Sequence, residues 1–228
     1  MIMYNCNKIV YSRLFPKLDK EKYKLLKIDT ESISYITTPN SAKQITQIIK
    51  SYFNKQKLTP NTIIDCTACV GGDSISFANT FNKVFSIEID KNRYEMLINN
   101  INIYELSNIS VFNCNCLEQL KKLSNSFIQV VYFDPPWGGS DYKISTNLRL
   151  SIGTESIEKI TVDLITRKYL KKPPIFIIFK LPKNYDIHYF FIKVTIKKEI
   201  KIYLHELKKI NIIIVENNYT DNDYIIIE

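Results

Sequence analysis

From residue 62 onward, short apolar and β-branched runs alternate with longer segments in which apolar residues recur every three or four positions. The runs are typical of buried strands, and the longer segments are typical of amphipathic helices. Because strands that alternate with helices at this spacing form parallel sheets covered on both faces, the pattern predicts a doubly wound α/β fold. The predicted strands are 62–67, 83–89, 109–113, 129–134 and 175–181, and the predicted helices lie near 73–81, 91–105, 116–123 and 155–170.

The C-terminal third departs from this alternation. Two runs rich in Ile and Val, 192–203 and 210–216, are separated by a short link at 204–209. Such a pair predicts two antiparallel strands at one edge, which makes the sheet mostly parallel and seven-stranded. Residues 224–228 are predicted to form a frayed extra strand or a tail.

The first 60 residues are polar and helix-prone. Thr38 followed by Pro39 is a typical N-cap and first-turn pair, and the apolar residues after them have helical spacing. The sequence therefore predicts a short helical N-terminal extension over 1–60 that contributes to the functional site. One main domain is predicted over 61–228.

Charge narrows the class of partner. The chain of 228 residues has a formal net charge of +8 and a pI of about 9.1, which favours nucleic acid over a merely soluble basic surface. Its N-terminus lacks the layout of a signal peptide, and no apolar run approaches the roughly 20 residues that span a bilayer. We expect an intracellular, soluble protein with no membrane partner.

The five cysteines are an odd number in a chain too large to need disulfides, so they are predicted to be reduced thiols. Cys66-x-x-Cys69 and Cys114-x-Cys116 are the pairs that a zinc site would use. Both pairs follow predicted strands and have no histidine nearby, so they are interpreted as small apolar side chains. No metal site is predicted.

Two strand ends carry features of a cofactor site. Asp65 ends the first predicted strand, and Gly71-Gly72 follow it at the start of a helix, where glycine permits close backbone approach. The G-x-G-x-x-G pattern of dinucleotide sites is absent, which disfavours NAD; a simple tight turn is the alternative. Glu88 ends the next strand and is placed to accept both hydroxyls of a ribose, unless it is only a solvated acid. Asp90 is interpreted as the N-cap of the following helix.

The fourth predicted strand ends in Asp134-Pro135-Pro136-Trp137, the most informative motif of the chain. The exocyclic amine of a nucleobase is planar and a poor nucleophile, so its methylation needs polar groups that hold the nitrogen and a flat surface for the ring. Asp134 and the Pro135 carbonyl can accept the two N–H bonds, and Trp137 can stack on the ring. A turn with a buried tryptophan is the alternative.

The fifth predicted strand ends in a basic segment, Lys180-Leu181-Pro182-Lys183-Asn184, which we call the rim. Lys180 and Lys183 can hold phosphate oxygens. In a chain this rich in lysine, a solvated edge is the competing interpretation.

Together these segments resemble the trimethylguanosine synthase family, over roughly residues 10 to 216. The resemblance implies a Rossmann-like class I S-adenosylmethionine-dependent methyltransferase acting on guanine N2 of the RNA cap. It makes Asp65, Gly71, Gly72 and Glu88 cofactor contacts, together with Thr38 and Asp134. Trp137 becomes the plane on which 7-methylguanine stacks, while Lys183, Asn184 and Lys180 become substrate contacts.

Three positions differ from the family pattern. Asp134 stands where the family usually has Ser, and Cys69 stands where it has glycine. Asn115-Cys116 replace the acid that accepts the adenine amino group, so these two residues are the predicted contacts there.

Three functions are open at this point. The first is methyl transfer to N2 of 7-methylguanosine in capped RNA by a monomer, which the short N-terminal segment favours because it leaves no room for an appended RNA-binding domain. The second is an internal guanine-N2 or adenine-N6 methyltransferase acting on tRNA, rRNA or DNA. The third is a catalytically silent methyltransferase-like protein that binds capped RNA or a partner protein.

Overall fold

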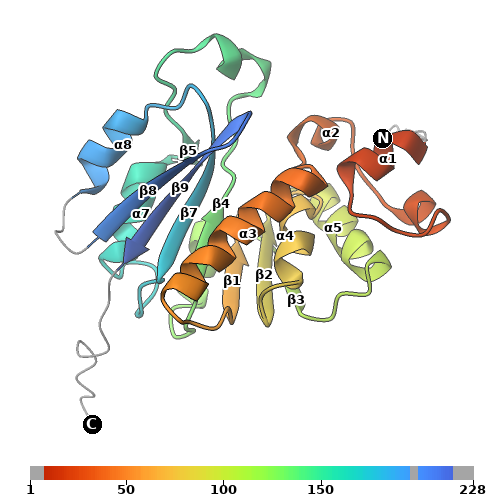
Figure 1. The fold of residues 1–228 in the computed structure, drawn as a ribbon, viewed down its shortest axis with the longest axis horizontal. Helices are drawn as coiled ribbons and strands as arrows, with labels where there is room; N and C mark the ends of the chain where they lie inside the picture. The colour runs from red at the N-terminus through yellow and green to blue at the C-terminus, as the bar shows by residue number, and fades with distance from the viewer. Residues whose placement is uncertain (1–7, 196–199, 218–228) are drawn as a thin grey trace. The chain divides into compact units, whose positions relative to one another are not determined.

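The computed structural model describes residues 8–195 and 200–217. The chain divides into two compact units, Met1–Gln119 and Leu120–Glu228, and each is described by itself. Figure 1 labels most of the helices and strands of both.

The first unit is a three-stranded parallel sheet with its helices. In this sheet β2 lies between β1 and β3, and Ile63 of β1 is in register with Val84 of β2. Helices α3 and α4 pack side by side (Figure 1). The elements are α1 (Lys8–Leu14), η1 (Lys22–Leu25), α2 (Ser32–Tyr35), α3 (Pro39–Lys55), β1 (Thr62–Asp65), α4 (Gly72–Ala78), β2 (Lys83–Glu88), α5 (Lys91–Ile103), β3 (Ile109–Asn113) and α6 (Cys116–Lys122), the last of which crosses the boundary between the units.

The second unit contains the mixed part of the sheet. Strand β7 pairs with β4 in parallel and with β9 antiparallel, and β9 pairs with β8 antiparallel. All seven residues of β7 are buried, as expected for a strand covered on both faces. The elements are β4 (Val130–Phe133), η2 (Gly139–Ile144), β5 (Ser151–Ile152), β6 (Glu155–Ser156), α7 (Ile157–Ile165), β7 (Phe176–Pro182), α8 (Ile187–Val194), β8 (Ile200–Glu206) and β9 (Ile210–Asn217).

The strand order β3-β2-β1-β4-β7-β9-β8 is that of a seven-stranded, mostly parallel sheet. The predicted α/β class with an antiparallel C-terminal edge is therefore confirmed. The five parallel strands lie within two residues of their predicted bounds, because each combines an apolar run with a polar break.

One predicted strand was wrong in its first part. Residues 192–194 belong to α8, and only 200–206 form the strand. The Asp186 side chain accepts a hydrogen bond from the Tyr189 amide at 2.9 Å and so caps a helix. Phe190 and Val194 then lie four residues apart on its buried side. Residues 196–199 and the predicted tail at 224–228 lie outside the described residues.

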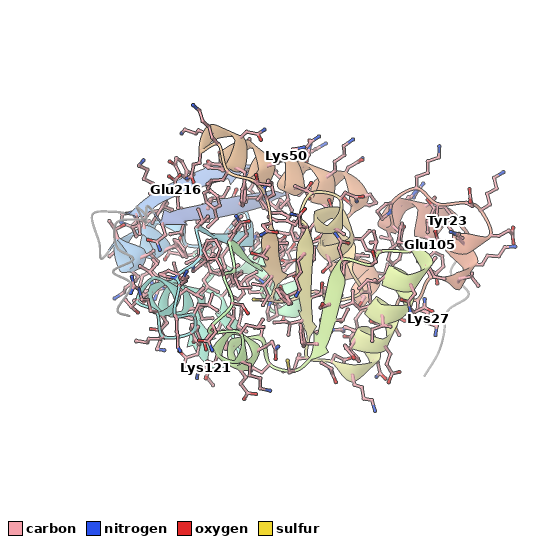
Figure 2. The ribbon with its side chains drawn as sticks, turned by 90° about the horizontal axis from the view of Figure 1, so that it is seen from below. Tyr23, Lys27, Lys50, Glu105, Lys121 and Glu216 are labelled. Carbon is pink, nitrogen blue, oxygen red and sulfur yellow. The ribbon has the colours of Figure 1, made fainter. Side chains whose placement is uncertain are left out.

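The N-terminal segment packs on the first unit through a small core of its own. Phe15, Tyr23, Leu26 and Ile36 share a buried cluster with Val70. Beside this cluster, Lys22 of η1 bonds to Glu105 at 2.6 Å; Glu105 follows α5 and is labelled with Tyr23 in Figure 2. The segment is therefore an integral layer of the first unit, and its assignment as a separate extension over 1–60 stays a prediction.

Asn100 joins this segment to the rest of the unit. Its side-chain oxygen accepts from the Lys27 amide at 2.8 Å, and its nitrogen donates to the carbonyls of Lys27 at 2.8 Å and Val70 at 3.0 Å. The side chain is fully buried. Removing it leaves three backbone groups without this partner.

We therefore expect Asn100→Ala to lower the free energy of unfolding by about 2–3 kcal/mol, since unsatisfied buried polar groups cost that order of energy. The neighbouring Asn99 is partly exposed and donates to the Leu25 carbonyl at 2.8 Å and to the Asn100 side-chain oxygen at 3.3 Å, so its removal leaves only one backbone group without this partner and serves as the control. Asn99→Ala should cost less than about 1 kcal/mol. Urea unfolding of both variants measures the difference, and equal losses would contradict the role of Asn100.

Candidate active site

Asp65 shapes the turn that follows β1. Its carboxylate accepts from the Ser74 hydroxyl at 2.6 Å and from the Thr67 amide at 3.2 Å, and Ser86 donates to Ser74 at 2.8 Å. Asp65 is almost completely buried. The acid therefore ties the strand end to the first turn of α4, and its predicted contact with a cofactor stays a prediction.

The two glycines of this turn have different roles. Gly71 has φ 106°, a left-handed conformation that disfavours a side chain, and it is the N-cap of α4. A Cβ at Gly72 would lie 2.8 Å from the Thr37 carbonyl oxygen. The close approach at Gly72 is thus made by the N-terminal segment, which the Thr37 hydroxyl also fastens to Asp73 at 2.6 Å. A sequence pattern alone gave no sign of this contact.

Glu88 is a buried acid at the end of β2. Its carboxylate oxygens accept from the amides of Cys69 and Asp90, both at 2.8 Å. Desolvation by burial raises the pKa of Glu88, although both hydrogen bonds oppose that shift. Each carboxylate oxygen has a second lone pair, so Glu88 can still accept ribose hydroxyls while it holds the two loops. The predicted N-cap at Asp90 is confirmed by its bond from the Arg93 amide at 2.9 Å.

Cys69 occupies the position where the resembled family has glycine. Its φ of 49° lies in the left-handed region, which explains why glycine suits this site. The thiol donates to the Ser32 hydroxyl at 3.3 Å, and burial raises its pKa to about 11. The side chain is therefore a neutral thiol that packs toward the N-terminal segment.

The other predicted cofactor contacts lie at helix starts. Thr38 is the exposed N-cap residue of α3, with its hydroxyl on that of Ser41 at 3.1 Å. Asn115 accepts from the Leu117 amide at 2.8 Å at the start of α6. Cys116 is buried and hydrogen-bonded to Cys66, whose pKa is raised by burial and by that contact. The structure thus gives each of these side chains a local partner, and their roles toward a cofactor stay predictions.

In the second unit, the Asp134-Pro135-Pro136-Trp137 motif directly follows β4. Asp134 accepts a hydrogen bond from the Lys180 ammonium on β7 at 2.5 Å. Lys180 is buried, with only 7% of its side chain exposed. This ion pair was not indicated by the sequence, because 46 residues separate its members and strand pairing brings them together.

Trp137 is half-buried beside the pair. The Lys180 nitrogen lies 5.4 Å from the centroid of its ring, within the range of a cation–π contact. Tyr142 packs edge-on against the indole, with centroids 5.1 Å apart and planes at 74°. The indole Nε1 is buried and makes no hydrogen bond among the described residues. A buried donor without a partner is costly.

The loop after Trp137 is held in place by Asn184. The Asn184 amide donates to the carbonyls of Tyr142 at 2.5 Å and Ser145 at 2.7 Å, at the two ends of the last turn of η2. Gly138 and Gly139 have φ of 93° and 72°, and a Cβ on either would meet nothing within 4 Å. These glycines are therefore needed for backbone conformation and not for space. Asn184 supports the loop that carries Tyr142.

The two lysines of the rim differ. Lys183 is exposed, and its ammonium lies 3.7 Å from a Glu206 oxygen. Lys180 is buried against Asp134, which excludes the interpretation of this lysine as a solvated edge. Phosphate binding by Lys183, and substrate contacts by Lys180 and Asn184, stay predictions.

Solved structures identify the class of fold. The METTL16 MTase domain superposes with a TM-score of 0.57 at 16% identity, over 77% of this chain and 67% of that one. SMU.1697c of Streptococcus mutans, solved in complex with S-adenosylhomocysteine (SAH), gives a TM-score of 0.50 at 16% identity, over 75% and 97%. The fold is the Rossmann-like fold of methyltransferases.

The sequence comparisons then identify the family. Residues 60–227 match the family model of RNA cap guanine-N2 methyltransferases, and the chain belongs to this family. It is 34% identical over 221 residues to uncharacterized protein L320 of Acanthamoeba polyphaga mimivirus, covering 89% of this chain and 84% of that protein.

Two more distant relatives carry named activities. Trimethylguanosine synthase of Schizosaccharomyces pombe is 29% identical over 134 residues, which are 57% of this chain and 54% of that protein. Ribosomal RNA small subunit methyltransferase D of Buchnera aphidicola is 24% identical over 186 residues, which are 76% of this chain and 86% of that protein.

The protein is thus a methyltransferase that uses S-adenosylmethionine. The first unit fits this cofactor, because a left-handed glycine turn follows β1 and a buried acid with spare acceptor capacity ends β2. No group of three metal-binding side chains occurs among the described residues. Within 8–195 and 200–217, no helix has both the length and the apolarity to cross a bilayer.

Replacing Cys69 measures the strain of its left-handed backbone. Both Cys69→Gly and Cys69→Ala lose the thiol bond to Ser32, but only alanine keeps a Cβ at φ 49°. We expect Cys69→Gly to be more stable than Cys69→Ala by about 1 kcal/mol in urea unfolding. An alanine variant as stable as the glycine variant would show that this conformation carries no strain.

Proposed function

We propose that the chain transfers a methyl group from S-adenosylmethionine to the exocyclic N2 of 7-methylguanosine in the 5′ cap of RNA, giving a di- or trimethylguanosine cap. The observation that carries the proposal is Trp137: a half-buried indole, buttressed by Tyr142, directly after Asp-Pro-Pro at the end of β4. A positively charged 7-methylguanine on an indole face gains about 0.5–2 kcal/mol of cation–π attraction over neutral guanine.

The first unit supplies the cofactor side of this proposal. Glu88 accepts the ribose hydroxyls while its bonds to the amides of Cys69 and Asp90 hold both adjoining loops. Asp65 and Gly71 fix the turn before α4, and the Asn115 and Cys116 region borders the adenine. When bound, S-adenosylmethionine would supply a methyl group on a sulfonium: the S–C bond breaks as the N–C bond forms, and the neutral thioether leaves. The proton that the amine loses would pass to the Asp134 carboxylate.

The second unit supplies the base side. Asp134 and the Pro135 carbonyl accept the N–H bonds of the guanine amine, which directs the nitrogen lone pair out of the ring plane as the N–C bond forms. Trp137 holds the ring flat. Positioning and exclusion of water then provide most of the acceleration.

The charge of +8 serves the phosphates of the cap and of the RNA behind it. Lys183, which is exposed at the end of β7, is the proposed ligand of the cap phosphates. Asn184 acts through the loop that it holds.

A second candidate is methylation of guanine N2 or adenine N6 inside tRNA, rRNA or DNA. Two observations favour it: Asp134 in place of the family's Ser, and the match to ribosomal RNA small subunit methyltransferase D. A third candidate, a silent domain that binds capped RNA or a protein, rests on Cys69 and Cys116 at the cofactor turn.

Incubation with tritiated S-adenosylmethionine distinguishes the candidates. The panel is 7-methylguanosine triphosphate, GTP, capped RNA with and without N7 methylation, tRNA and DNA. We expect label only in the N7-methylated nucleotide and cap. Label in tRNA or DNA would favour the second candidate, and calorimetry without SAH binding at millimolar ligand would favour the third.

Trp137 is the only tryptophan of the chain, so its fluorescence reports on the base site directly. We expect 7-methylguanosine triphosphate to quench it more strongly than GTP. Trp137→Ala should reduce methyl transfer by about 100-fold or more while SAH binding by calorimetry changes little, because stacking positions the base and the cofactor groups lie elsewhere in the chain. Loss of SAH binding would show that Trp137 is structural.

The buried Glu88 predicts that the affinity for SAH depends on pH. Burial raises the pKa of Glu88, so its carboxylate becomes protonated at a higher pH than an ordinary glutamate and then accepts ribose hydroxyls less well. The affinity for SAH should therefore fall as pH falls through this raised pKa. Glu88→Gln should bind SAH weakly and without that dependence. The control Glu105→Gln, at an exposed pair with Lys22, should keep it.

A further inference from the structure

A buried lysine stands next to the ring that the proposed function uses to bind a cation. The Lys180 ammonium is 2.5 Å from an Asp134 oxygen and 5.4 Å from the centroid of Trp137. Only 7% of the Lys180 side chain and 17% of the Asp134 side chain are exposed. Water therefore screens these charges weakly, and they act on anything bound at the ring.

The lysine alone would oppose the binding of 7-methylguanine. Its positive charge lies within the distance at which a cation interacts with an indole, and a second cation on that ring would be repelled. The carboxylate of Asp134 compensates this charge at contact distance. The carboxylate offsets the charge of Lys180, so the repulsion that a cationic base meets at the ring is reduced.

We propose that Asp134 and Lys180 form a charge-compensated pair that sets the preference of Trp137 for N7-methylated over unmethylated guanine. Lys180 is a positioning residue in this arrangement, since it holds Asp134 in place and does not itself bind phosphate. Asp134 has two functions, as acceptor for the guanine amine and as counter-charge to Lys180. This inference rests on the proposed cap specificity.

The local geometry supports a positioning function for Lys180. The lysine projects from β7, a strand buried along its whole length, and Asp134 follows β4, its parallel neighbour. Phe133 of β4 is in register with Phe179 of β7, and their rings stack with centroids 5.1 Å apart. The residues after this stacked pair, Asp134 and Lys180, are thus held opposite each other by rigid strands.

The test is a double-mutant cycle read by Trp137 fluorescence. Asp134→Asn, Lys180→Met and the double variant are titrated with 7-methylguanosine triphosphate and with GTP at pH 7, and the ratio of the two dissociation constants is the measured quantity. Both ligands carry the same triphosphate, so changes in phosphate binding cancel in the ratio. What remains is the response to the positive charge of the base.

The two single variants should change this ratio in opposite directions. Asp134→Asn removes the counter-charge and should lower the preference for the N7-methylated ligand by about threefold or more. Lys180→Met removes the positive charge near the ring, leaves the Asp134 carboxylate without its counter-charge, and should raise the preference by a similar factor. The double variant removes both charges, and its preference should return to within about twofold of the unmodified protein.

An exposed lysine that also pairs with a buried acid provides the control, Lys168→Met. Lys168 also pairs with a buried carboxylate of the second unit, that of Asp163, at 2.6 Å, and it has no part in the proposed site. It should leave the preference unchanged. Thermal unfolding of each variant shows whether it is folded. The double variant has no unpaired buried charge, so it can still be tested if a single variant is unstable.

The outcomes separate this inference from the proposed function. If 7-methylguanosine triphosphate does not quench Trp137 in the unmodified protein, the cap function itself is wrong. If it quenches with the expected preference but all three variants keep the ratio of the unmodified protein, the cap function stands and the charge pair has no influence on specificity. A double variant with a ratio as low as that of Asp134→Asn also overturns the inference.

Discussion

The carboxylate of Glu88 is the interaction on which the first unit depends. A parallel sheet places the carboxyl ends of its strands at one edge, and the loops that leave this edge must be held there by something other than strand pairing. Glu88 accepts from the amide of Cys69 in one loop and of Asp90 in the next. It thereby fixes the turn before α4 and the start of α5 with one side chain. Burying the carboxylate has a desolvation cost. This cost raises the pKa of Glu88, although both hydrogen bonds lower it.

Because Glu88 holds the Cys69 amide, the backbone there keeps its left-handed conformation without glycine. Cys69 adds a thiol contact to Ser32, a residue of the N-terminal segment. Gly72 admits the Thr37 backbone, and Asn100 bonds both Lys27 and Val70. The cofactor turn and the N-terminal segment are thus built as one structure. A substitution that loosens the segment will also alter the turn.

Local signals account for what the sequence predicted well. A cap such as Asp90 is recognised from its own few residues, and a buried strand such as Val130–Phe133 from its apolar run. The strand predicted from Ile-rich composition was wrong at 192–194. Asp186 caps a helix there, and the helical spacing of Phe190 and Val194 outweighs β propensity.

The contacts that define the site are not local in sequence. The Glu88 bond to Cys69 spans 19 residues, and the Asp134 bond to Lys180 spans 46. Each depends on how strands pair, which no motif encodes. The sequence therefore predicted which residues line the strand ends, and the structure added which of them are bound to each other. In this way Asn184 proved to hold the loop that carries Tyr142, and Lys180 proved to pair with Asp134.

The second unit keeps groups at its motif that stability alone would not favour. The indole nitrogen of Trp137 is buried without a hydrogen-bond partner among the described residues, and an unsatisfied donor of this kind costs about 1–3 kcal/mol. Replacing a buried ion pair such as Lys180–Asp134 by apolar side chains is often neutral or stabilising. Both features are concentrated around one ring, and the loop that carries Tyr142 is anchored beside it by Asn184. Unfavourable contributions to stability that are concentrated at one position are typical of a binding site, since such features persist where they serve function instead of stability.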